Sequence, residues 1–245
     1  MNDIPFPETL AQFNTDPRSL LWKIPGIWPL DKPSGPSSNL LVVRSRKVLG
    51  TKRTGHAGTL DPLASGLLLI LAGNATRLFD CLQEAHKTYV ATFTLGYRTD
   101  SQDITGETIE SFSPTTAVPV PQSALESTLA RFTGDILQTP PMHSALKKDG
   151  QPLYKLARQG VTVERAARPM TVYSLRLLAF NGSEGTLEME VSKGFYVRTL
   201  IDDIGLALGT GAVMTALRRS KIGPFSLDDA IPLEEMEQRR NSDHI

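Results

Sequence analysis

Apolar positions along the chain follow two different periods. Over residues 88–95 and 187–191 every second residue is apolar, the pattern of a strand with one buried face. Residues 67–72 form a continuous apolar run that is long enough for a buried strand, although periodicity alone leaves a helix open. Residues 38–49, 125–132 and 199–208 instead have a pattern typical of helices. Strands and helices are therefore both expected, which predicts a mixed α/β architecture.

The expected helices carry end signals. Ser37 or Ser38 can cap the first helix, and Gly50 can end it. The four residues from Ser123 to Glu126 are similar to a capping box at the start of the second helix. Gly209 follows the third helix and is expected to end it.

Residues 138–168 interrupt the regular pattern. They are rich in proline, glycine and basic side chains, and they contain a short helical pattern near Leu153 to Gln159. A long segment of this kind within a compact domain is often functional. We therefore expect an extended excursion from the domain, referred to below as the 138–168 excursion.

The composition excludes several classes of protein. Of 245 residues, 40% are apolar and 21% are charged, as in ordinary globular proteins. No apolar run reaches the roughly eighteen residues that a membrane-spanning helix needs. The single cysteine, Cys81, excludes an intrachain disulfide, and the four histidines have no spacing typical of a zinc site. We therefore expect no transition metal.

The net charge is zero, but basic and acidic residues are separated along the chain. The basic stretches hold Lys32, Arg44, Arg46, Lys47, Lys52 and Arg53, and then Lys147, Lys148, Lys155, Arg158, Arg165 and Arg168. The acidic groups hold Asp100, Asp103, Glu107 and Glu110, and then Asp228, Asp229, Glu234, Glu235 and Glu237. This separation indicates one basic side that faces RNA, unless each run is only the solvated face of a helix.

One carboxylate, Asp61, follows a turn rich in glycine and precedes an apolar run. Gly55 and Gly58 allow a compact turn that approaches a partner closely, and Pro62 restricts Asp61 to extended backbone. Two interpretations are open at this point. Asp61 is either the N-cap of a helix that begins at Pro62 or a carboxylate held ready for chemistry.

Five segments of the chain form a set of motifs, and they run from Leu30 to Ser38, Gly55 to Leu68, His86 to Asp100, Pro140 to Gly160 and Ser192 to Arg219. Together they resemble the TruB family of pseudouridine synthases, which isomerise a uridine in the T-loop of tRNA. They follow one another in the order expected for the family and span most of the chain. The resemblance implies the pseudouridine synthase fold, which is α/β (α+β mixed) with a central mixed, largely antiparallel sheet flanked by helices.

The resemblance also implies how the chain is divided. Residues 1–25 are expected to be an N-terminal arm, 26–225 the catalytic domain and 226–245 a short C-terminal tail. The 138–168 excursion corresponds to the family's mobile clamp on the T-arm. Larger bacterial members append a small β-rich RNA-binding domain, and we expect this chain to be a form that lacks it.

Three residues match catalytic positions of the family. Asp61 matches the catalytic aspartate, and Arg198 matches the arginine that pairs with it and keeps it ionised. Tyr89 matches the tyrosine that stacks on the uracil and assists removal of the C5 proton. Without the resemblance, Arg198 would be interpreted as a surface arginine and Tyr89 as a packing residue of a strand.

Further residues are expected to bind the substrate or to support the site. Tyr196 and Leu217 match the walls of the uracil pocket, and His56 matches a histidine implicated in flipping the uridine out. By their sequence context alone, the first two are core residues and His56 is a polar residue of a surface turn. Candidate phosphate contacts are Lys52, Arg53, Lys147 and Lys148. Lys32 and Pro33 are expected to support the active-site loop.

The resemblance implies a cytoplasmic, cofactor-independent tRNA pseudouridine synthase that acts on uridine 55. Its expected partner is tRNA, bound at the T-arm and elbow, and neither a membrane nor an obligatory protein partner is expected. Two alternatives stay open. One is a non-catalytic module that binds and folds tRNA, and the other is a guide-dependent pseudouridine synthase acting on ribosomal RNA.

Overall fold

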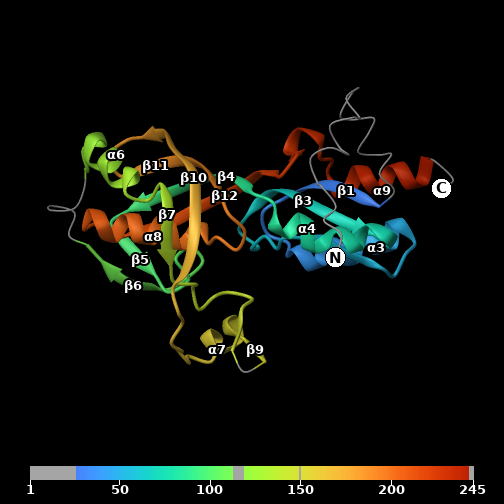
Figure 1. Cartoon of the computed structure of the whole chain (residues 1–245), viewed down its shortest axis with the longest axis horizontal. Helices are drawn as coiled ribbons and strands as arrows, with labels where there is room; N and C mark the ends of the chain where they lie inside the picture. Colours follow the sequence, from blue (N-terminus) through green and yellow to red (C-terminus); the bar gives the residue numbers. More distant parts are fainter. Residues whose placement is uncertain (1–25, 113–118, 149, 243–245) are drawn as a thin grey trace. The chain divides into compact units, whose positions relative to one another are not determined.

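The computed structural model describes residues 26–112, 119–148 and 150–242 (Figure 1). The chain forms two compact units. The first contains the residues up to Glu84 together with those from Lys221 onward, and the second runs from Ala85 to Ser220. The expected N-terminal arm, residues 1–25, lies outside the described residues.

The first unit is built around a fully buried strand. Strand β3 (Ser65–Ala72) lies between β1 (Ile27–Lys32) and β2 (Thr54–Ala57) and is antiparallel to both. From Gly66 to Ala72 every residue of β3 is buried, which explains why its apolar run does not alternate. The prediction of a strand over residues 67–72 is therefore confirmed. The unit also contains η1 (Gly73–Leu78), α4 (Phe79–Glu84), β13 (Phe225–Ser226) and η2 (Leu227–Asp229).

Two helices, α3 (Ser38–Leu49) and α9 (Leu233–Ser242), contribute to the core of this unit. Ser37 caps α3 by accepting a hydrogen bond from the Leu40 amide, and Gly50 ends it at a φ of 63°. Both end signals are as predicted. One cluster of the core contains Leu30, Leu41, Val42, Leu68, Ile70, Ile231, Leu233 and Met236. Ile231, Leu233 and Met236, which fall within the expected C-terminal tail, thus belong to the packed interior of the first unit.

The second unit contains a twisted sheet with the strand order β12-β4-β11-β10-β7. Its strands are β4 (Lys87–Leu95), β7 (Gly134–Gln138), β10 (Arg168–Phe180), β11 (Glu184–Val191) and β12 (Ala212–Ile222). The pairs β4 with β11, β11 with β10 and β10 with β7 are all antiparallel. Alternate residues of β4 and β11 are buried, which confirms both predicted strands.

Helices α6 (Gln122–Ala130) and α8 (Val197–Leu208) pack together, α6 against β10 and α8 against β4. Gly209 ends α8 in the left-handed conformation, as predicted. The prediction of a capping box at the start of the second helix is wrong. The N-cap of α6 is Pro121, so Ser123 lies inside the helix and does not cap it. A short hairpin, β5 (Tyr97–Thr99) and β6 (Thr108–Ser111), lies between β4 and α6 in the sequence.

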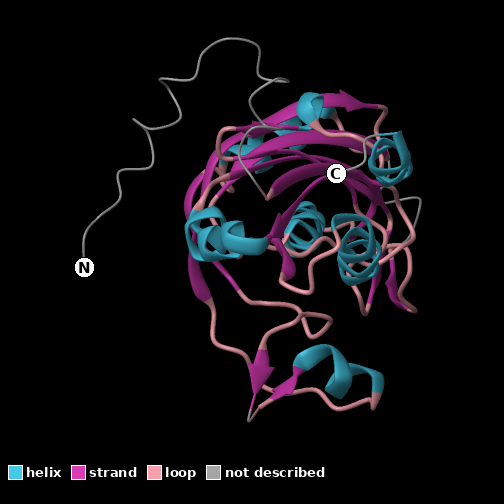
Figure 2. Cartoon of the chain, turned by 90° about the vertical axis from the view of Figure 1, so that its right-hand side faces the viewer, coloured by secondary structure: helices cyan, strands magenta, loops and turns pink. Residues whose placement is uncertain are grey.

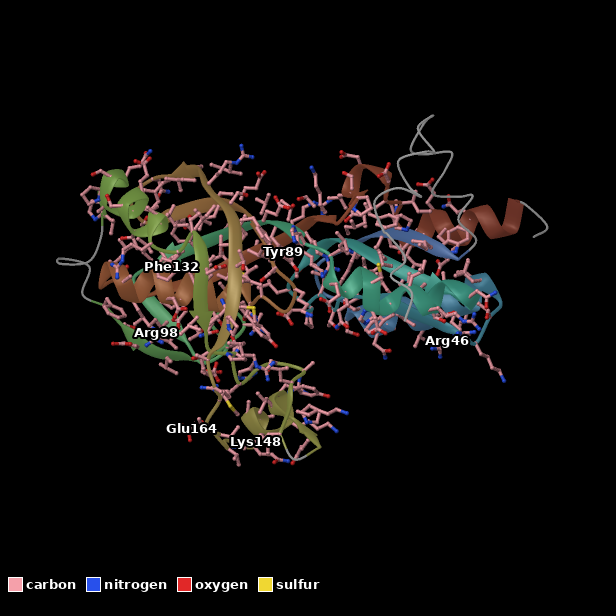
Figure 3. All side chains as sticks on the ribbon, in the orientation of Figure 1. Arg46, Tyr89, Arg98, Phe132, Lys148 and Glu164 are labelled. Atoms are coloured by element: carbon pink, nitrogen blue, oxygen red, sulfur yellow. The ribbon has the colours of Figure 1, made fainter. Side chains whose placement is uncertain are left out.

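The 138–168 excursion leaves the sheet at the end of β7 and returns at the start of β10. It holds β8 (Lys147–Lys148), β9 (Gln151–Pro152) and α7 (Leu153–Arg158), so the predicted short helix is confirmed. In Figures 1 and 2 these elements lie apart from the sheet of the second unit. Figure 3 labels Lys148 and Glu164 on the 138–168 excursion.

The two units together confirm the expected fold class, because helices flank sheets whose strand pairs are largely antiparallel. Within the described ranges, no helix has both the length and the apolar character that crossing a membrane requires.

Candidate active site

Lys32, at the end of β1, supports the loop that carries Asp61. Its side chain is completely buried (0% exposed). The ammonium donates hydrogen bonds to three carbonyl oxygens, those of Pro33 at 3.0 Å, Pro62 at 3.2 Å and Ala64 at 2.6 Å. Three acceptors match the three protons of an ammonium group, so the buried charge is well solvated by the backbone. The expectation that Lys32 supports this loop is confirmed.

The segment from Ser34 to Ser38 holds the same loop at further points. The Ser38 hydroxyl accepts from the amide of Leu60 and donates to its carbonyl, each at 2.9 Å. The Ser34 hydroxyl donates to the Leu63 carbonyl at 2.9 Å, and the Gly35 amide donates to the Pro62 carbonyl at 2.8 Å. The backbone is thus fixed on both sides of Asp61.

Asp61 itself lies in a turn. The amide of Ala64 donates to the Asp61 carbonyl at 3.1 Å, and the next regular element is strand β3 from Ser65. Since no helix begins after Asp61, the interpretation of this residue as a helix N-cap is wrong. The loop presents a carboxylate on a rigid backbone, which is the arrangement that preorganised catalytic groups need.

Three expected substrate-binding residues lie on or beside β2. His56 is half-buried on the strand, opposite Ile70 of β3. Lys52 and Arg53 are exposed in the preceding turn, and the carbonyl of Arg53 accepts a hydrogen bond from the Gly73 amide at 2.8 Å. These basic side chains thus lie in the same unit as the Asp61 loop and precede it by fewer than ten residues in the sequence.

The predicted basic side needs one correction. Lys32 is buried and bound to carbonyls, and Arg44 forms ion pairs with Glu237 at 3.0 Å and Glu234 at 3.5 Å on α9. Acidic residues from the end of the chain thus neutralise a member of the first basic stretch, an interaction that the linear charge pattern does not show. The prediction that this whole stretch faces RNA is wrong for Lys32 and Arg44.

In the second unit, Arg198 lies at the start of α8 and is only 5% exposed. Its two terminal nitrogens donate to the carbonyl of Ser101 at 2.8 Å and to the carbonyl of His143 at 2.9 Å. Its Nε lies 3.8 Å from the Asp103 carboxylate. The interpretation of Arg198 as a surface arginine is therefore wrong, and its predicted pairing with Asp61 stays a prediction.

The loop from Thr99 to Thr105 is built to hold the charge that faces Arg198. One Asp103 oxygen accepts from the Ser101 hydroxyl at 2.8 Å, from the Thr105 amide at 2.9 Å and from the Thr105 hydroxyl at 2.5 Å. The other oxygen is the one that faces Arg198. These hydrogen bonds fix the orientation of a buried carboxylate beside a buried guanidinium.

Arg98 of β5 and Gln102 of this loop both bind Asp202 on α8. Arg98 donates two parallel hydrogen bonds to the Asp202 carboxylate, at 2.7 and 2.9 Å, and these raise the pKa of Arg98 above its usual range. Gln102, in a left-handed conformation with a φ of 65°, donates to Asp202 at 3.1 Å and accepts from Thr199 at 2.8 Å. The first two turns of α8 are therefore tied to this loop.

The remaining predicted site residues lie in the second unit. Tyr89 is buried on β4 (Figure 3), and Leu217 is buried on the adjacent strand β12. Tyr196 is the N-cap residue of α8, two positions before Arg198. Lys147 and Lys148 are exposed on the 138–168 excursion, on β8.

Gln138 and the Thr99–Thr105 loop were not among the predicted site residues. The motif from His86 to Asp100 stops within this loop, and the closely spaced short polar side chains that follow were the available signal. Gln138 has no such signal, because its partners are backbone atoms 58 positions further along the chain.

Two family models match the chain. The one described as TruB family pseudouridylate synthase (N terminal domain) covers residues 46–197, and the one described as tRNA pseudouridylate synthase B C-terminal domain covers 198–244. The first match contains the Asp61 loop, and the second begins at Arg198.

Curated relatives and solved structures agree with these matches. Relatives named tRNA pseudouridine synthase B are 48% identical in Burkholderia lata, over 96% of this chain and 70% of the relative, and 46% identical in Bordetella pertussis, over 86% of each. A chain in the structure of an H/ACA ribonucleoprotein bound to a substrate RNA containing 2′-deoxyuridine superposes with a TM-score of 0.66 at 30% identity. That match covers 90% of this chain and 56% of the other. The chain thus belongs to the TruB family and is a pseudouridine synthase.

Proposed function

We propose that this chain is a tRNA pseudouridine synthase that isomerises uridine 55 of the T-loop, with Asp61 as its catalytic carboxylate. The observation that carries the proposal is the support of the Asp61 loop by Lys32 and the Ser34–Ser38 segment. A loop that caps no helix but is bound on both sides of one carboxylate is consistent with a preorganised reactive group. The tRNA substrate follows the names of the curated relatives.

The reaction is an isomerisation, so its atoms and electrons balance without a redox partner. The bond from C1′ to N1 of uracil breaks, the ring turns, and a bond from C1′ to C5 forms. C5 then loses its proton and N1 gains one. Ionised Asp61 would act as nucleophile, base or electrostatic stabiliser in the first step, and these three roles stay open.

Arg198 is proposed to pair with Asp61 and to keep it ionised. A guanidinium buried this deeply needs partners for its own charge. Asp103 and the carbonyls of Ser101 and His143 supply them. They hold Arg198 in one orientation, as expected for a preorganised partner of a carboxylate.

Substrate binding is proposed to involve three kinds of interaction. Tyr89 stacks on the uracil and assists removal of the C5 proton, while Tyr196 and Leu217 wall the pocket. His56 occupies the space that the flipped uridine leaves. The exposed side chains of Lys52, Arg53, Lys147 and Lys148 bind phosphates.

The test is release of tritium from C5-labelled uridine in an unmodified tRNA transcript, with no other protein or RNA present. The control is the same transcript with cytidine at position 55. The proposed enzyme is cytoplasmic and needs no obligatory protein partner. We therefore expect tritium release from the first transcript only.

Other outcomes would contradict the proposal in distinct ways. Equal release from both transcripts would mean that another uridine is the substrate. Tight binding without release would favour the tRNA-folding module. Release that requires an added guide RNA would favour the guide-dependent alternative.

A further inference from the structure

Gln138, the last residue of β7, is bound to the residue at which α8 begins. The side chain is 1% exposed. Its Oε1 accepts a hydrogen bond from the Tyr196 amide at 2.8 Å, and its Nε2 donates to the Tyr196 carbonyl at 3.0 Å. One side-chain amide therefore satisfies both polar backbone groups of a single residue, as a neighbouring strand would.

The orientation of this amide is fixed by its partners. A backbone N–H can only donate and a backbone carbonyl can only accept, so Oε1 must face the first and Nε2 the second. No other side chain of similar length offers a donor and an acceptor in this geometry without a charge. Glutamine is thus matched chemically to this position, and a residue that only filled the space would not be.

The position of Gln138 relates it to the reaction. Tyr196 is the N-cap of α8 and has no side-chain cap of its own, so the path of the chain into the helix depends on external contacts. Arg198 follows two residues later. The carbonyl of His143, five residues beyond Gln138 on the 138–168 excursion, accepts from Arg198 at 2.9 Å.

From this geometry we propose that Gln138 is a positioning residue of the pseudouridine synthase reaction. It holds the backbone of Tyr196 and thereby fixes the Tyr196 ring and the Arg198 guanidinium relative to the sheet. The inference rests on the proposed function in one respect, namely the roles of Tyr196 in the uracil pocket and of Arg198 beside Asp61. Gln138 reaches them through the backbone and needs no contact with RNA.

The test compares Gln138→Met and Gln138→Glu with the wild type. Methionine keeps the length and removes both hydrogen bonds, so kcat should fall by about 10- to 100-fold, the effect of misplacing reacting groups by roughly 1 Å. The KM for tRNA should change by less than about threefold, because the four side chains proposed to bind phosphates are unaltered.

Gln138→Glu supplies a readout that a space-filling role would not affect. The ionised carboxylate can accept from the Tyr196 amide but repels its carbonyl, whereas the protonated form can again donate to it. Burial favours the protonated form, so kcat relative to wild type should rise as the pH is lowered from about 8.5 to about 6. Other ionisable side chains on the surrounding elements are Arg168, Arg198, Asp103 and His143. These groups are present in both the wild type and Gln138→Glu, so their own effect on kcat cancels in the ratio of the two kcat values.

The control is Gln122→Glu, the same substitution at an exposed position of α6. It removes only a surface hydrogen bond to Glu126, so its kcat should match that of the wild type at every pH. A kcat for Gln138→Met within twofold of wild type would overturn the inference. The inference would also be overturned if the kcat of Gln138→Glu relative to wild type did not change with pH. It would likewise be overturned if the Gln138→Glu protein were unfolded and did not refold when the pH was lowered. A wild type that releases no tritium would instead contradict the proposed function, so the two failures are distinguishable.

Discussion

At the residue scale, Lys32 shows how a side chain's charge and its place in the sequence can mislead. Its position in a basic stretch suggested RNA, whereas its motif suggested support of the active-site loop, and the structure confirms the second. Lys32 was identified through its motif and not through its partners, which are backbone carbonyls up to 32 positions away. Gln138 also binds only backbone atoms, those of Tyr196, and it lies outside the five segments that carry the resemblance, so nothing in the sequence marked it.

The first prediction concerns Lys32→Met. This change keeps the length of the side chain but leaves three carbonyls without their charged donor. Unfolding free energy should fall by roughly 2–4 kcal/mol, since buried hydrogen bonds to a charged group are removed. Catalysis should fall further than stability alone explains, because the Asp61 loop loses a support. Urea denaturation and tritium release measure the two effects. The exposed Lys221→Met is the control, and equal behaviour of both variants would contradict the prediction.

At the element scale, helices were predicted well where their ends are local. Ser37, Gly50 and Gly209 act at their own helix termini, so sequence was sufficient. The predicted start of α8 at Thr199 was two residues late, and the N-cap residue there, Tyr196, is bound by Gln138 from another strand. The capping box at Ser123 failed because Pro121, with a φ of −61°, already sets the start of α6.

The second prediction concerns the pH dependence of α8. Burial, and then the neighbouring Asp202 carboxylate, raise the pKa of Asp203 to about 6. A folded-state pKa above the unfolded value of 3.8 means that stability is present at low pH and is lost as the pH rises through 6. Asp203→Asn should therefore unfold at higher urea than wild type at about pH 8, by roughly 1 kcal/mol, because partial exposure reduces the effect. The difference should vanish near pH 4, and a gain that persists or grows in acid would contradict it.

The third prediction concerns α9. Met236 is 2% exposed within the core of the first unit. Met236→Ala should lower the free energy of unfolding by about 2–5 kcal/mol, as expected when a buried side chain is truncated. Gln238→Ala, at an exposed position of the same helix, is the matched control. If both variants had the stability of the wild type, α9 would not be a part of the folded unit in solution.

At the scale of the whole molecule, the linear charge pattern predicted a basic side only in part. Arg44 is neutralised by α9, whereas the basic side chains at Lys52, Arg53, Lys147 and Lys148 are exposed. Ion pairs between segments about 190 residues apart in the sequence cannot be inferred from either segment alone. The fold class, in contrast, was predictable because motifs spread over most of the chain agree with one family.

The fourth prediction is that these four exposed residues bind phosphates of the tRNA backbone. Replacing one with alanine should weaken binding to all tRNA species alike. The slope of log K against log salt should become shallower by about 0.7 to 0.9 for each phosphate interaction that is removed. Filter binding at several salt concentrations measures it. Arg131→Ala, at an exposed position at the end of α6, is the control, and a slope unchanged in all four variants would remove them from the RNA interface.

The measurement that tests the central claim most directly is the rate of tritium release by Asp61→Asn. Asparagine keeps the shape of the side chain and removes its charge, and the loop is held through backbone atoms that the substitution does not touch. The rate should fall by roughly a thousandfold or more, while the urea midpoint and tRNA affinity stay close to wild type. Asp80→Asn, at an exposed position of α4, should be fully active. An active Asp61→Asn enzyme, or one that has lost its fold, would contradict the assignment of Asp61 as the catalytic carboxylate.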